Sequence, residues 1–217
     1  MSNIFDLFKK IEKEQTPVMP VAFIVVGLGN PGPDYVNTRH NAGFLALDYI
    51  AERTGCNINR AKYDALYGEA RISGQRVLLI KPQTYMNNSG IAVRQFAEFY
   101  KIPPEHIIVI SDDISLPVGR MRVRRSGSDG GQRGLKSIIY HLNSDAFPRV
   151  KMGVGEKPDP NYDLADWVLS KFTADEQKIL FDKFGTAMAG IEKIISGDID
   201  GAMMLCNTNN KAKKEAE

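Results

Sequence analysis

His40 is the side chain best placed in this sequence to move a proton. It lies in a polar loop that follows the apolar run Phe23–Val26, and loops at the ends of buried strands carry much of the chemistry of α/β proteins. The other two histidines suit structural roles, because His106 precedes an apolar run and His141 lies near the expected end of a helix. An imidazole in the first position can act as a general base, with a satisfied surface or capping role as the ordinary alternative.

Asp112 follows closely on a second apolar run, Ile107–Ile110. Because neighbouring parallel strands end at the same edge of a sheet, its carboxylate can meet the His40 imidazole there. A carboxylate on one ring nitrogen fixes the tautomer and stabilises the protonated ring, so the other nitrogen can take a proton from water. The two residues therefore predict a base that activates water.

Neither a protein nucleophile nor a metal site is expected beside this pair. The sequence has no G-x-S-x-G motif, Cys56 and Cys206 have no histidine next to them, and H-x-x-x-H spacing is missing. We therefore expect no metal and no cofactor. Asn30 and Asn87 follow expected strands and can present amides to a carbonyl or its developing oxyanion, or can serve as ordinary turn formers.

The glycines of Gly27-x-Gly29-x-x-Gly32 match the dinucleotide-binding pattern G-x-G-x-x-G. That pattern binds a pyrophosphate only where a helix begins at once. Here Pro31 and Pro33 flank the last glycine, and helical periodicity begins only near residue 40. We therefore reject a dinucleotide site.

The segment 120–136 holds six cationic side chains against one anionic side chain, Asp129. Arg120, Arg122 and Arg124 are spaced by two, which places them on one face of an expected strand. A solvated surface is the usual explanation of such a run, but three arginines beside a glycine-rich loop suit phosphate oxygens. We expect this face to bind an RNA backbone.

Apolar strand-like runs alternate with helical patterns along the chain. This order predicts an α/β fold, a single-domain three-layer sandwich with a mixed, mostly parallel central sheet and helices on both faces. A capping box of Thr173 and Glu176 should open the last helix, and Gly55 should end the first. The segment 163–170 has the character of a lid. Strands are expected near 23–26, 67–72, 76–80, 107–110, 120–124 and 150–154, and helices near 42–54, 89–100, 135–142 and 173–195.

The 217 residues, 43% hydrophobic and 25% charged, suit one globular domain. We place it at 21–206, between an N-terminal extension, 1–20, with the spacing of a short amphipathic helix, and a polar tail, 207–217. Two cysteines and the lack of any apolar run of about 18 residues favour reduced thiols in the cytoplasm and no membrane span.

Several blocks of the sequence together resemble the bacterial-type peptidyl-tRNA hydrolase family. These are GLGNPG at 27–32 with TRHN at 38–41, KPQTYMN at 81–87, DDI at 112–114, and the segment 130–136. The likeness spans about 22–200 in the family's order. It implies hydrolysis of the ester that joins a peptide to the 3′ ribose of tRNA, by a monomer without metal.

The resemblance also assigns roles to residues of this chain. It carries His40 over as the base, Asp112 as the partner that orients it, and Asn30 as the residue that senses the N-blocked peptide. Contacts with the substrate ends fall to Tyr35, Tyr85, Met86 and Asn87, and contacts with tRNA phosphates to Arg122, Arg124 and Lys151.

Four positions depart from the family's pattern. Gln132-Arg133 stands where His-Asn is common, so the cation of Arg133 replaces an amide that positions substrate. Ser115 stands where aspartate is frequent, and Lys151 where arginine is frequent.

A non-catalytic RNA-binding relative, similar to the chloroplast intron-splicing factors that share the fold, is the alternative function. The joint presence of Asn30, His40, Asn87 and Asp112 favours the enzyme, because RNA binding alone does not require them.

Overall fold

Short β-branched runs form the middle of a seven-stranded sheet in the computed structural model, which describes residues 19–208. The strand order is β2-β3-β4-β1-β5-β7-β6. The four central strands, β4, β1, β5 and β7, are parallel, and the edge strands pair antiparallel. The strands are β1 Val21–Gly27, β2 Arg60–Lys62, β3 Ala65–Ile72, β4 Gln75–Pro82, β5 Ile107–Asp113, β6 Met121–Arg124 and β7 Arg149–Gly153.

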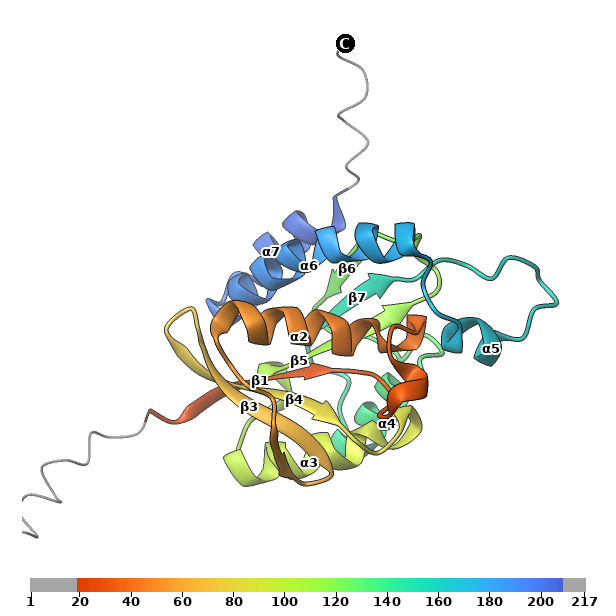
Figure 1. Cartoon of the computed structure of the whole chain (residues 1–217). Helices are drawn as coiled ribbons and strands as arrows, with labels where there is room; N and C mark the ends of the chain where they lie inside the picture. The colour runs from red at the N-terminus through yellow and green to blue at the C-terminus, as the bar shows by residue number, and fades with distance from the viewer. Residues whose placement is uncertain (1–18, 209–217) are drawn as a thin grey trace, which may run out of the picture.

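Helices cover both faces of the sheet (Figure 1). Helices α2 (Ala42–Thr54), α6 (Ala174–Ile195) and α7 (Ile199–Asn207) share one apolar core with one face of the sheet. Helices α3 (Ser89–Tyr100) and α4 (Arg133–Leu142) share a second core with the other face. Alternate residues of β1 enter the two cores, as period-two side chains must. The predicted three-layer α/β fold is confirmed.

A short helix, α5 (Leu164–Leu169), lies at the carboxyl edge of the parallel strands, on the same side as the loop between β1 and α2 (Figure 1). Four 3-10 turns complete the described elements, three of them in the loops that leave the parallel strands β1 and β4 at this edge. They are Pro33–Tyr35, Arg39–Asn41, Met86–Asn88 and Pro104–His106.

Local signals placed two helix ends correctly. Gly55 follows α2 with φ 66°, the left-handed conformation that glycine adopts freely. Thr173 accepts from the backbone N–H of Glu176, and the Glu176 carboxylate accepts from the backbone N–H of Thr173, which is the predicted capping box.

The C-terminal end of the domain differs from the sequence-based expectation. Helix α7 was not expected, and its last residue, Asn207, was placed in the polar tail. The Asn207 side chain instead bonds to the N–H and C=O of Val123 on β6, at 2.6 and 3.1 Å. The predicted N-terminal helix lies almost wholly outside the described residues.

No helix within residues 19–208 combines the length and apolarity needed to cross a lipid bilayer.

Close backbone packing holds the start of α2 against the ends of β1 and β5. A Cβ atom on Gly43 would collide with the carbonyl oxygen of Ile110 and lie 2.5 Å from the amide nitrogen of Leu28. Only glycine fits there, and the turn that carries His40 directly precedes it. The approach therefore fixes where His40 stands relative to β5.

We predict that Gly43→Ala lowers the free energy of unfolding by about 1–3 kcal/mol, because a methyl group is forced into packed backbone. Urea unfolding measures this. Gly185→Ala in α6 is the control, since its Cβ would make an ordinary 3.4 Å contact with the Tyr49 hydroxyl. Equal stability of Gly43→Ala and the wild type would contradict the packing argument.

Candidate active site

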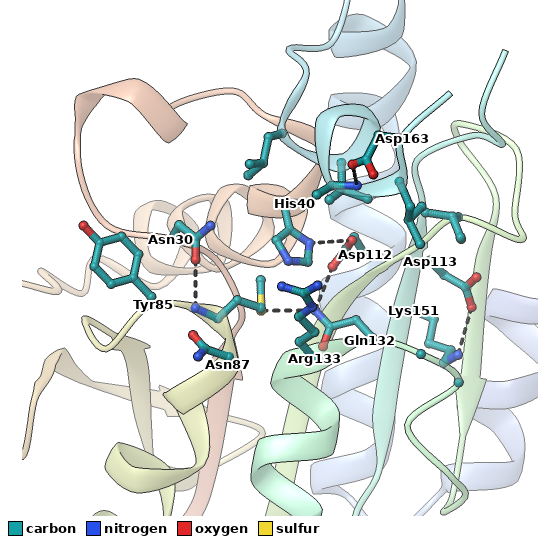
Figure 2. Close-up of a pocket in the computed structure, with 18 residues that line it drawn as sticks. Asn30, His40, Tyr85, Asn87, Asp112, Asp113, Gln132, Arg133, Lys151 and Asp163 are labelled. Carbon is teal, nitrogen blue, oxygen red and sulfur yellow. Dashed lines mark hydrogen bonds and ion pairs between the residues drawn. The ribbon is translucent and has the colours of Figure 1, made fainter. Parts of the chain in front are cut away.

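A cleft of about 490 Å³ opens at the carboxyl edge of the parallel strands (Figure 2). One side is formed by loops after β1, β4 and β5 and by the start of α4, and the other by α5. Most of the predicted site residues line it: Asn30, His40, Tyr85, Met86, Asn87, Asp112, Arg133 and Lys151. The sequence thus predicted most of one wall of a single cavity.

His40 and Asp112 meet in this cleft although 72 residues separate them. The His40 Nδ1 atom lies 2.8 Å from Oδ2 of Asp112 (Figure 2). Their exposures are 9% and 3%, so the pair is shielded from bulk water. An ionised carboxylate only accepts hydrogen bonds, so such a contact is formed by an Nδ1–H group, and in a neutral ring with that tautomer the lone pair is on Nε2.

Arg39 fixes the turn that carries His40. Its guanidinium is 4% exposed, forms a bidentate pair with Glu176 at 3.0 and 2.8 Å, and donates to the carbonyl of Val154. It also stacks on the ring of Trp167 in α5, 3.8 Å from the centroid. This single side chain therefore ties the His40 turn to α5, to α6 and to the residue that follows β7.

Asn30 has its amide orientation set by the backbone of a neighbouring loop. Its Oδ1 accepts from the N–H of Met86 at 2.8 Å, while Asn41 bonds to both backbone groups of Asn30. The Asn30 Nδ2 group makes no hydrogen bond within the described part of the chain and lines the cleft. It is consequently free to donate to a ligand.

The aromatic side chains lie at the mouth of the cleft. Tyr85 is 55% exposed and has a positive φ of 53°, a strained conformation for a non-glycine residue. Tyr35 does not line the cleft but meets Tyr85 edge to face, with ring centroids 6.2 Å apart. Asn87 and Arg133 are both exposed at the cleft and form no side-chain hydrogen bond within residues 19–208.

The basic strand has the two faces that its alternation predicts. Met121 and Val123 are buried, whereas Arg122 is partly exposed and Arg124 exposed. Arg122 pairs in register with Lys151 on β7, which itself lines the cleft. Cationic side chains therefore lead from the cleft onto the edge of the sheet.

Lys151 is less free than its neighbours on this surface. Its Nζ lies 2.9 Å from Oδ2 of the buried Asp113, and Ser115 bonds to the other oxygen through its N–H and its hydroxyl. Burial raises the pKa of Asp113, but the bonds from Ser115 and Lys151 outweigh it and bring that pKa below the usual value. The Lys151 ammonium group is therefore partly neutralised by Asp113, which weakens its attraction for an anionic ligand.

Sequence reasoning missed the apolar wall of the cleft. Leu164, Ala165, Val168 and Leu169 come from α5, whose N-cap, Asp163, accepts from the backbone of Ala165 and Asp166. The sequence predicts a lid-like segment at 163–170, but periodicity in so short a helix does not say which face it buries. The aspartate cap was the available signal.

Across residues 19–208, no group of three or more His, Cys, Asp or Glu side chains has the arrangement of a metal site.

The chain matches a known protein family over most of its length. Residues 24–215 match the sequence model of a family described as peptidyl-tRNA hydrolase. The chain belongs to the peptidyl-tRNA hydrolase family. The prediction made from the sequence blocks is confirmed.

Individual peptidyl-tRNA hydrolases agree with this assignment. One from Clostridium botulinum (strain Eklund 17B / Type B) is 51% identical over 181 residues, which are 83% of this chain and 93% of the relative. One from Alkaliphilus metalliredigens is 50% identical over 182 residues, 83% of this chain and 97% of the relative. The crystal structure of peptidyl-tRNA hydrolase from Acinetobacter baumannii superposes with a TM-score of 0.81 at 33% identity, covering 88% of this chain and 96% of that one.

The Arg39–Glu176 pair gives a prediction on stability. Burial raises the pKa of Glu176, yet the hydrogen bonds from Arg39 and Thr173 bring it below the ordinary value of 4.5. Because the pKa of Glu176 is lower in the folded state than in the unfolded chain, the ionised carboxylate stabilises the fold at pH values above 4.5. This stabilisation is lost as the pH falls through the lowered pKa.

We predict that Glu176→Gln lowers the free energy of unfolding at pH 7 by about 1–3 kcal/mol, because a buried cation loses its charged partner. The difference from the wild type should shrink as pH falls below 4.5. Urea titrations at several pH values measure both effects. Glu98→Gln, in the exposed Arg94–Glu98 pair, is the control; a loss as small as the control's would contradict the role given to Arg39.

Proposed function

We propose that this peptidyl-tRNA hydrolase cleaves the ester between a peptide and the 3′ ribose of tRNA with His40 as the general base. The overall reaction follows from the family to which the chain belongs. The observation that supports the base is the 2.8 Å contact between His40 Nδ1 and the buried Asp112 carboxylate, at the wall of a cleft.

In the first step, His40 Nε2 takes a proton from water while the water oxygen attacks the ester carbonyl. The imidazolium that forms is stabilised by Asp112, which keeps the ring in one orientation throughout. The carbonyl oxygen becomes an oxyanion, and the amide groups of Asn30 and Asn87 can donate to it. The intermediate then expels the ribose oxygen, which receives the proton back from His40, leaving a free peptide acid and free tRNA.

The residues along the cleft suit both parts of this substrate. The exposed ring of Tyr85, with Met86 beside it and Tyr35 behind, offers a surface for the substrate ends. The free Nδ2 of Asn30 can donate to a carbonyl of an N-blocked peptide. The exposed guanidinium of Arg133 adds a cation where an anionic tRNA end would lie.

We further propose that Arg122, Arg124 and Lys151 bind tRNA phosphates. The register between β6 and β7 supports this, since Arg122 stands directly beside Lys151 at the rim of the cleft. Because Lys151 is already paired with Asp113, the arginines should supply most of the attraction. That the protein is a monomer and acts in the cytoplasm, where translation produces peptidyl-tRNA, stays a prediction.

The alternative is a relative that binds RNA without catalysis. Such a protein needs the basic strand but has no use for a buried imidazole–carboxylate pair beside a cleft. The geometry of His40 and Asp112 therefore favours the enzyme.

We predict that His40→Ala lowers kcat by about 10²–10⁴-fold while RNA binding is kept, because only the proton acceptor is removed. Hydrolysis of N-acetyl-aminoacyl-tRNA measures turnover, with unblocked aminoacyl-tRNA as the substrate control. His106→Ala is the matched control variant, since that ring lies against Phe23, away from the cleft. Wild-type turnover by His40→Ala would overturn the mechanism.

We predict that Arg122→Glu raises KM and leaves kcat at saturating substrate near the wild-type value. The plot of log binding constant against log salt should become less steep by about one, because one phosphate contact is lost. Arg71→Glu, an exposed arginine on β3, is the charge-matched control. An unchanged salt slope would show that this strand does not contact the RNA backbone.

A further inference from the structure

Gln132 contacts the Asp112 carboxylate on the side opposite His40. Its Nε2 donates to Oδ1 of Asp112 at 2.9 Å, while His40 holds Oδ2 (Figure 2). Within residues 19–208, these are the two side chains that hydrogen-bond to Asp112. Both carboxylate oxygens are therefore fixed.

The orientation of the Gln132 amide is set by a second contact. Its Oε1 accepts from the backbone N–H of Leu135 at 2.7 Å, which makes Gln132 the N-cap of α4. Its Nε2 also lies 3.1 Å from the sulfur of Met86. Turning the amide over would put its oxygen against the Asp112 carboxylate and its NH₂ against an N–H, so only the observed orientation satisfies both partners.

We propose that Gln132 is a positioning residue that holds Asp112 in place, and in its charged form, for the His40 base. The proposal rests on the function given above for the His40–Asp112 pair.

The chemistry of the amide explains why it suits this position. Asp112 is 3% exposed, and a buried carboxylate oxygen without a donor is costly. A neutral amide supplies that donor without adding positive charge. The negative charge of Asp112 therefore remains available to stabilise the imidazolium that forms when His40 takes a proton.

Other charged groups near the pair are mostly engaged elsewhere. Asp113 is paired with Lys151, Arg39 is paired with Glu176, and Asp163 caps α5. Arg133, the residue after Gln132, is the cation at the cleft without a carboxylate partner in the described part of the chain. These groups are unchanged in the variants below, so their influence cancels in the comparison.

Gln132 also has a purely structural role as the N-cap of α4. Two variants that keep the cap distinguish this role from the positioning of Asp112. In Gln132→Glu a carboxylate oxygen still accepts from Leu135, with the helix dipole in favour, but the donor to Asp112 becomes a like charge. In Gln132→Ser a strong N-cap residue remains but is too short to reach Asp112.

For Gln132→Glu we expect the acid side of the kcat profile to move to higher pH by about one unit, because a second carboxylate beside Asp112 favours the protonated pair. Turnover should recover at higher pH, with KM within about twofold of the wild type. For Gln132→Ser we expect kcat to fall roughly 10-fold, because a buried donor is lost. Thermal midpoints should stay within about 2 °C of the wild type.

Gln75→Glu at the start of β4, at the opposite edge of the sheet, is the control for the added charge. The proposal is overturned if the pH profile of kcat for Gln132→Glu coincides with that of the wild type. It is also overturned if turnover falls only together with the thermal midpoint of unfolding, while the pH profile of kcat does not move. His40→Ala is assayed alongside. An inactive His40→Ala with wild-type Gln132 variants would remove only the role of Gln132, whereas an active His40→Ala would remove the base itself.

Discussion

The contact between His40 and Asp112 depends on the geometry of parallel strands. Strands β1 and β5 are neighbours in register, with Gly27 beside Ile110, so the residues that follow each strand emerge at one edge. The close approach of Gly43 to β5 then places the turn before α2 directly over Asp112. A sheet with these two strands apart would leave the imidazole without its carboxylate.

Buried polar contacts make this arrangement rigid on several sides. Arg39 ties the histidine turn to three other segments through Glu176, Val154 and Trp167. Asn30 is locked by Met86, which leaves one amide group directed at the cleft. Each contact joins elements that are distant in sequence, so the site is assembled only when the whole domain folds. Arg122 and Arg124 of β6 lie outside the cleft. The RNA binding proposed for them can therefore be altered separately from the ester hydrolysis proposed for His40.

Local features of the sequence were sufficient for most of the fold. Gly55 and the Thr173–Glu176 capping box act within one turn of a helix, so their effect can be predicted without knowledge of the tertiary structure. Helix α7 was missed, and its last residue, Asn207, is held by hydrogen bonds to Val123, which lies 84 residues away. Such a long-range contact leaves no local signal in the sequence. The same limit applies to the site: His40 and Asp112 were predicted from strand ends, whereas the pairing of Lys151 with Asp113 and of Gln132 with Asp112 depends on side-chain directions that spacing does not contain.

The central claim is that Asp112 holds the proton of His40 on Nδ1 and leaves Nε2 as the base. Nitrogen-15 NMR of the imidazole in the intact protein measures this directly, because protonated and unprotonated ring nitrogens differ in chemical shift. At a pH where the enzyme turns over, the account predicts the Nδ1–H tautomer for His40. Asp112→Ala should change this tautomer, whereas Asp145→Ala, which removes a carboxylate outside the cleft, should not. Observation of the Nε2–H tautomer in the active wild-type protein would contradict it.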